Sequence, residues 1–149
     1  MKFARSLIAV VILGLSGTAN AASRDFNRSL ECRYASEQGN RTMNVHEAKL
    51  TIACAVHQMP VVGGVTRALC IAERESGFYF HATNPSGASG IFQVVRGTWA
   101  SWTAHFASWR HQHAIPPNVF SGRANILVAI RAASQWGWGS WSTAGGCGS

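Results

Sequence analysis

Carboxyl groups are scarce in this chain, and their positions limit where acid chemistry can take place. All six acids precede Ser76, and they are Asp25, Glu31, Glu37, Glu47, Glu73 and Glu75. The first three fall in a polar stretch without helical periodicity, and the fourth is explained by capping of a helix. The last two therefore remain as candidates for chemistry in the main part of the fold.

Helical spacing separates these two acids. Ala68, Ile71 and Ala72 recur at i, i+3 and i+4, and Glu75 continues this apolar stripe at i+7. Residues two apart on a helix point about 200° away from each other, so Glu73 belongs to the outer face. A carboxyl group between an apolar stripe and a Gly-rich loop would be partly desolvated, which favours its protonated form. Glu75 could then donate a proton to a departing glycosidic oxygen, or it could merely accept hydrogen bonds from loop amides.

Periodic apolar residues predict two helices in the first half of the chain. Asn44, with an acid three residues later, predicts the start of a helix over residues 45–58. Thr66 is expected to cap a second helix that runs through residue 76. The stretch 83–90 is dense in turn-forming residues and predicts a loop or a small hairpin.

Two more helices and an irregular tail are expected in the second half. Thr98 can cap a third helix, which carries aromatic residues at helical spacing: Trp99, Trp102, Phe106 and Trp109. A fourth helix should begin at Ser121 or Gly122 and end at Gly137. No pattern supports a large sheet, so the fold class is expected to be mainly α with a loop-rich or short β-hairpin insertion.

The first 21 residues predict a secretory signal peptide. Lys2 and Arg5 precede an apolar run too short to span a bilayer, and an A-x-A cleavage site ends at Ala21. The remaining 128 residues (149 minus 21) would form an irregular lead-in over 22–43 and one domain over 44–149. No stable membrane insertion is expected after cleavage, and the exported chain would be periplasmic or extracellular, at the cell wall.

Four cysteines in an exported chain predict two disulfides, for which three pairings are compatible. Cys32–Cys54 and Cys70–Cys147 are favoured, because each would tie an irregular end of the chain to a predicted helix. No two cysteines have a C-x-x-C spacing, so a zinc site is not expected.

Charge and motif content narrow the partners. Removal of Lys2 and Arg5 leaves eleven basic residues against six acids, a net charge of +5, which suits anionic cell-wall polymers. The basic residues are scattered, so no nucleic-acid partner is expected. Only His111 and His113 are close together, without an acid nearby, and no phosphate loop or nucleophile elbow occurs. We therefore expect neither a metal nor a cofactor.

Two ordered motifs resemble those of a known family. E-S-G-F at residues 75–78 and G-A-S-G-I-F-Q at 87–93 resemble the signature of soluble lytic transglycosylases and related goose-type lysozymes. N-I at 125–126 resembles the family's third motif, and G-W-G-S-W at 137–141 is similar to the end of actinobacterial resuscitation-promoting and transglycosylase domains. The resemblance covers about residues 66–147. It implies a small lysozyme-like domain with the insertion beside its active-site cleft.

The resemblance implies Glu75 as the general acid and Gln93 as a residue that lines the sugar cleft. The substrate-binding residues predicted around it are Ser76, Gly90, Ile91, Phe92, Gln93, Asn125 and Trp138. Gly90 would let the backbone approach a sugar ring, and the next three residues would present apolar and amide surface to it. Gln93 could instead hydrogen-bond locally.

The tryptophans divide into two groups. Trp99, Trp102 and Trp109 share a helical stripe, so we expect them to pack in the core. Trp138 and Trp141 fall outside any period and are candidates for the rim of the cleft.

A glycosidase ordinarily needs a second carboxylate, and none follows Glu75. Lytic transglycosylases use one Glu, which implies that Glu75 protonates the bond between N-acetylmuramic acid and N-acetylglucosamine in peptidoglycan glycan strands. It would then take the C6-hydroxyl proton and leave a 1,6-anhydro end.

Three alternatives remain open. A hydrolytic, goose-type-like lysozyme would require Glu73 or a lead-in acid to fold over the cleft. A non-catalytic peptidoglycan-binding module and a cationic membrane-active protein would not need Glu75. An association with a wall-spanning secretion or conjugation apparatus is equally open.

Overall fold

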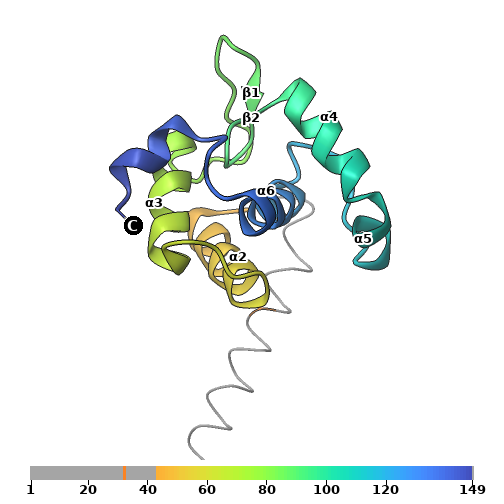
Figure 1. The fold of residues 1–149 in the computed structure, drawn as a ribbon. Helices are drawn as coiled ribbons and strands as arrows, with labels where there is room; N and C mark the ends of the chain where they lie inside the picture. Colours follow the sequence, from red (N-terminus) through yellow and green to blue (C-terminus); the bar gives the residue numbers. More distant parts are fainter. Residues whose placement is uncertain (1–31, 33–42, 149) are drawn as a thin grey trace, which may run out of the picture.

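The structure is a computed structural model that describes Cys32 and residues 43–148 (Figure 1). The predicted signal peptide and most of the lead-in lie outside the described residues. In chain order the elements are helices α2 (Val45–Gln58) and α3 (Gly64–Ser76), strands β1 (Ala88–Ser89) and β2 (Val94–Val95), helices α4 (Arg96–His105), α5 (Ala107–Gln112) and α6 (Gly122–Trp136), and the 3₁₀ helix η1 (Ser142–Gly146). The mainly α fold class is confirmed.

Helix α6 lies at the centre of the fold. Figure 1 shows it between α3 on one side and α4 with α5 on the other, with the β1–β2 hairpin beyond one end of α3. Nine of its fifteen residues are buried, because its sequence is apolar on most sides rather than along one stripe. It packs on α2, and α2 packs on α3. The central helix is therefore the support to which the outer elements are fixed.

Helix α2 has the predicted bounds and the predicted cap. The backbone N–H of Glu47 donates to Asn44 Oδ1 at 2.9 Å, and the backbone N–H of Asn44 donates to Glu47 Oε2 at 2.8 Å. This reciprocal pair satisfies two of the donors that a helix start leaves open. The Glu47 carboxylate is thus used in capping, as the sequence predicts.

The predicted cap of the second helix is wrong. Helix α3 begins at Gly64, two residues before Thr66, and its N-cap is Gly63 at φ 77°. Glycine adopts this left-handed conformation without steric cost, so the chain can turn into the helix there without a side-chain cap.

The predicted third helix is two helices, and it begins before its predicted cap. α4 starts at Arg96, directly after β2, so Thr98 lies inside its first turn. The break falls at Phe106, where the chain leaves the α-helical conformation (ψ 17°). The buried Arg110 accompanies it: its Nε donates to the carbonyl oxygen of Thr103 at 3.0 Å, which satisfies a backbone acceptor at the end of α4. Helical spacing did not predict this contact, because the aromatic residues keep the same period across the break.

The expected hairpin between α3 and α4 is present. β1 and β2 pair antiparallel, with Ala88 opposite Val95, and a bridge joins Thr83 to Ser89. Asn84 Oδ1 accepts hydrogen bonds from the backbone N–H groups of residues 86 and 88, which closes the turn that precedes β1.

The fourth helix also matches its prediction, with the Ser121 hydroxyl accepting from the N–H of residue 124.

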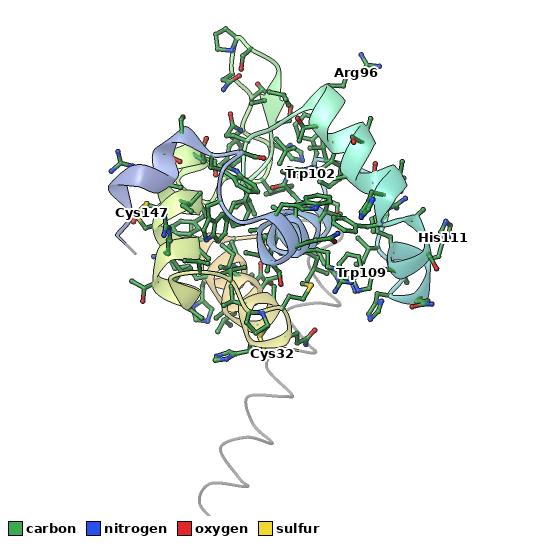
Figure 2. The ribbon with its side chains drawn as sticks, viewed as in Figure 1. Cys32, Arg96, Trp102, Trp109, His111 and Cys147 are labelled. Atoms are coloured by element: carbon green, nitrogen blue, oxygen red, sulfur yellow. A yellow bond between two sulfur atoms is a disulfide. The ribbon has the colours of Figure 1, made fainter. Side chains whose placement is uncertain are left out.

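Both favoured disulfides are confirmed. Cys32–Cys54 ties the lead-in to α2, and Cys70–Cys147 ties the C-terminal tail to α3. Figure 2 shows Cys147 beside α3, on the opposite side of the molecule from His111. Among the described residues, no helix combines the length and apolar composition needed to cross a membrane.

Candidate functional site

Glu75 lies on the last turn of α3. The helix ends at Gly77, whose left-handed conformation (φ 60°) lets its N–H reach back to the carbonyl of Glu73 at 2.8 Å. Glu75 is half-buried, whereas Glu73 is exposed, so the separation of the two acids by the helical wheel is confirmed. Thr143 of η1 donates its hydroxyl to Glu75 Oε1 at 2.6 Å. Among the described residues, Glu75 Oε2 has no hydrogen-bond partner.

Ser76 joins the end of α3 to the turn between β1 and β2. Its hydroxyl donates to the carbonyl oxygen of Ile91 at 2.8 Å. This bond fixes the distance between the helix that carries Glu75 and the segment that carries the second motif. Ser76 is partly buried, and the structure gives its hydroxyl a role in holding the site.

Gly90 is required by protein packing. A Cβ at this position would lie 2.3 Å from Asn125 Nδ2 and 2.7 Å from the carbonyl oxygen of Val119. The residue also has φ 77°, a conformation that side-chain-bearing residues rarely adopt. Asn125 and the segment before α6 occupy the space into which a side chain would point, so packing alone accounts for the glycine, and the approach of a sugar ring to Gly90 stays a prediction.

Asn125 lies beneath this turn with no exposed surface. Its Oδ1 accepts from the backbone N–H of Phe92 at 2.8 Å, and its Nδ2 donates to the carbonyl oxygen of Ser89 at 3.3 Å. The central helix thereby holds both sides of the turn through one side chain. These contacts give Asn125 a supporting role in the structure, and a contact between Asn125 and substrate stays a prediction.

Ile91 and Phe92 also have no exposed surface, so neither presents an apolar face to a sugar. The Phe92 ring stacks on Trp138, with 6.2 Å between centroids, and meets Trp141 edge-on at 6.0 Å. The turn held by Asn125 thus directs both of these consecutive side chains into the core.

Gln93 remains partly exposed, and its backbone has φ 47°. Its Nε2 donates to the carbonyl oxygens of Ala82 at 3.1 Å and Gly90 at 2.9 Å. Two carbonyl acceptors require the nitrogen on that side, which leaves the amide oxygen directed elsewhere. The local hydrogen bonding considered from the sequence is present, and Gln93 Oε1 has no partner among the described residues.

Trp138 and Trp141 lie in the core instead of on an open rim. Each is 6% exposed, and their indole N–H groups donate to the carbonyl oxygens of Val62 and Phe92, at 2.9 and 2.8 Å. These two hydrogen bonds allow the tail to bury both rings, because a buried indole N–H needs a hydrogen-bond acceptor. A contact between Trp138 and a sugar stays a prediction, since the residue borders an open hollow of about 380 Å³ beside η1.

The first group of tryptophans behaves as expected. Trp99 and Trp102 are each 7% exposed, and Trp109 packs partly buried against the core. Figure 2 shows Trp102 inside the molecule, in contrast to Arg96 at its edge. Trp102 contacts the ring of Trp141, with 5.4 Å between centroids.

Two features of the site were missed from the sequence. Thr143 falls in a tail without helical period, and only the favoured Cys70–Cys147 pairing could have placed it beside α3. The second is a surface group of aromatic rings formed by Tyr79, Phe80, His81 and Phe120, with neighbouring centroids between 4.2 and 6.2 Å apart. Tyr79 is 58% exposed and follows Glu75 by four residues in the sequence.

Glu75 does not line either of two hollows of the described surface. One of about 410 Å³ lies between the hairpin and the segment before α6, and the other is the hollow beside η1. The described residues contain no group of three or more His, Cys, Asp or Glu side chains that could hold a metal ion.

Comparison with known proteins gives two matches to this region. Residues 65–129 match the family model of the transglycosylase SLT domain. The chain is also 43% identical over 67 residues to a protein of Staphylococcus saprophyticus subsp. saprophyticus named "Probable transglycosylase SceD 2". That alignment covers 44% of this chain and 27% of the relative, so the chain matches about a quarter of the relative's length. No solved structure gives a significant match.

Proposed function

We propose that this chain, whose residues 65–129 carry a transglycosylase SLT domain, is an exported lytic transglycosylase that cleaves the glycan strands of peptidoglycan. The resemblance seen in the sequence is confirmed over that range. Two disulfides support export, because such bonds persist in oxidising compartments. An association with a secretion or conjugation apparatus is not part of this proposal, because neither the relative's name nor the described surface supports it.

The observation that carries the proposal is the setting of Glu75. One carboxyl oxygen is held by Thr143, the other has no partner among the described residues, and the side chain is half-buried. A group so placed can hold a proton on the unpaired oxygen and direct it toward a bound glycosidic bond. Gln93 Oε1, which has no partner among the described residues, can accept a hydrogen bond from a sugar hydroxyl or amide.

The other acids of the described part favour transfer within the substrate over hydrolysis. Glu47 is engaged in the cap of α2, and Glu73 is exposed on the outer face of α3. Neither is placed as the second carboxylate that an inverting or retaining glycosidase uses. Among the described residues no second carboxylate is placed to activate water, whereas the substrate's own C6-hydroxyl arrives already positioned and gains from proximity.

The proposed reaction needs one carboxyl group and no water. Glu75 donates its proton to the oxygen that links C1 of N-acetylmuramic acid to N-acetylglucosamine, and the C1–O bond breaks. The C6-hydroxyl of the same N-acetylmuramic acid then forms the new C1–O bond and returns its proton to Glu75. The products are a free N-acetylglucosamine hydroxyl and a 1,6-anhydro-N-acetylmuramic acid end.

Purified peptidoglycan digested with Glu75→Gln and Glu73→Gln variants tests the acid. Glu75→Gln keeps the size of the side chain and removes its proton, so we expect a loss of about 10²–10⁴-fold in rate with little change in folding. Glu73→Gln is the matched control, because it alters an exposed acid two residues away and should keep most activity. A loss below tenfold at Glu75 would refute the assignment.

Mass spectrometry of the products tests the reaction type. Anhydro ends are lighter than reducing ends by one water, so a transglycosylase and a lysozyme are distinguished directly. Predominantly reducing ends would move the protein to the hydrolytic side of the family. No turnover by the wild-type chain, with retained binding to peptidoglycan, would indicate a non-catalytic wall-binding module.

A further inference from the structure

The C-terminal tail touches the candidate site although it lies outside the residues matched by the family model. The match ends at residue 129, whereas Thr143 donates to Glu75 across 68 positions of the sequence. Figure 1 shows this last segment running from the end of α6 to the side of α3. The only described hydrogen bond to the Glu75 carboxyl group is therefore supplied by the tail.

Three further contacts fix the tail on the helix that bears the acid. The Cys70–Cys147 disulfide closes its far end, and Arg67 Nη2 donates to the carbonyl oxygen of Ala144 at 3.2 Å. Gly146 lies so close to the Arg74 guanidinium group that a Cβ would stand 3.1 Å from it. The residues that follow Thr143 are thus held against α3, so Thr143 does not belong to a free end.

The second motif fixes the beginning of the tail. Trp141 donates its indole N–H to the carbonyl oxygen of Phe92 and contacts the Trp138 ring, with 5.2 Å between centroids. The Phe92 backbone is itself held by Asn125. The turn that presents Gln93 and the tail that presents Thr143 are thereby packed as one unit against α6.

We propose that Thr143 is a positioning residue for Glu75, and that the tail from Trp138 to Cys147 completes the active site of this chain. The inference rests on the proposed function, because it assumes that Glu75 is the acid. The Thr143 hydroxyl fixes the rotation of the carboxyl group and occupies Oε1, so that the proton resides on Oε2. Its hydrogen bond strengthens when the departing proton leaves negative charge on the carboxyl group, since hydrogen bonds to ionised acceptors are about twice as strong as neutral ones.

A contact that strengthens during the reaction raises turnover more than it raises substrate affinity. Replacement of Thr143 by valine keeps the shape and removes the hydroxyl. We expect kcat to fall about tenfold, equivalent to about 1.4 kcal/mol in the activation free energy, with KM changed less than twofold. Thr143→Ser retains the hydroxyl donor, so we expect its kcat to stay within about threefold of the wild-type value.

The test measures kcat, KM and thermal unfolding for these two variants and for Thr66→Val, a matched control that makes the same change at an exposed threonine of α3. Introduction of Thr143→Val into Glu75→Gln should cause no further loss, because a residue that acts only through Glu75 has nothing left to position. Additive losses in this double variant would overturn the inference. So would a loss in Thr143→Ser as large as that in Thr143→Val, because the serine variant keeps the hydroxyl.

The two proposals fail in distinguishable ways. Full kcat in Thr143→Val, together with an inactive Glu75→Gln, would refute the positioning role and leave the acid in place. Activity retained in Glu75→Gln would refute the proposed function itself. Thr143→Ala provides a second loss of the hydroxyl if the valine variant does not fold, and it should show the same fall in kcat.

Discussion

Asn125→Ala distinguishes a supporting residue from a substrate contact. The substitution removes the acceptor of the Phe92 N–H, which is buried beneath the turn, and the donor to the Ser89 carbonyl. A buried donor left without a partner costs about 1–3 kcal/mol. The space left by the carboxamide adds about 1 kcal/mol, because the side chain has no exposed surface and the backbone around it is tightly packed.

The expected loss in the free energy of unfolding is therefore about 2–4 kcal/mol. At about 4 °C per kcal/mol for a domain of this size, the midpoint of thermal unfolding should fall by about 8–16 °C. Circular dichroism measures this fall without any assumption about the reaction. Asn118→Ala is the matched control, since that exposed side chain accepts one local hydrogen bond from the N–H of Phe120 and should cost under about 1 kcal/mol.

Activity measured well below the unfolding midpoint completes the comparison. If Asn125 supports the turn, the variant loses stability first, and its remaining activity falls because Gln93 is no longer held in place. A midpoint within about 2 °C of wild type, combined with a large rise in KM, would show instead that Asn125 contacts substrate, and our account of the turn would be wrong.

Two further predictions concern the turn and the tail. Gly90→Ala should destabilise the protein by about 3 kcal/mol or more, because its Cβ would collide with Asn125. Gly87→Ala, at φ 78° in open space, should cost only the conformational strain of about 1–2 kcal/mol, and equal losses in urea unfolding would contradict the packing argument. Intact-mass analysis after alkylation should find no free thiol in the exported chain. Two alkylated cysteines per chain would leave only one disulfide and would contradict the proposed pair of disulfides. Replacement of Cys70 and Cys147 by alanine should lower stability by about 4–5 kcal/mol, as expected for a crosslink over 77 positions, and an unchanged urea midpoint would exclude that contribution.

Local patterns in the sequence were sufficient for most of the helices. The cap formed by Asn44 and Glu47 and the full extent of α2 could be predicted, because both depend on contacts within one turn. The same period placed Glu75 on the inner face of α3 and Glu73 on the outer face. The two disulfides were favoured because each ties an irregular end of the chain to a helix. The ordered motifs indicated a resemblance to soluble lytic transglycosylases, and the SLT domain model matches residues 65–129.

Tertiary structure alone decided what surrounds Glu75. Thr143 lies 68 positions away, and Asn125 reaches Phe92 across 33, distances at which periodicity carries no information. Burial of Trp138 depends on the stacking of its ring against Phe92, which no pattern in the tail reveals. A sequence records which faces of each helix are apolar, whereas the partner of each face is chosen when the helices close around α6. The candidate acid Glu75 could therefore be predicted from the sequence, whereas the side chains that surround and hold it could not.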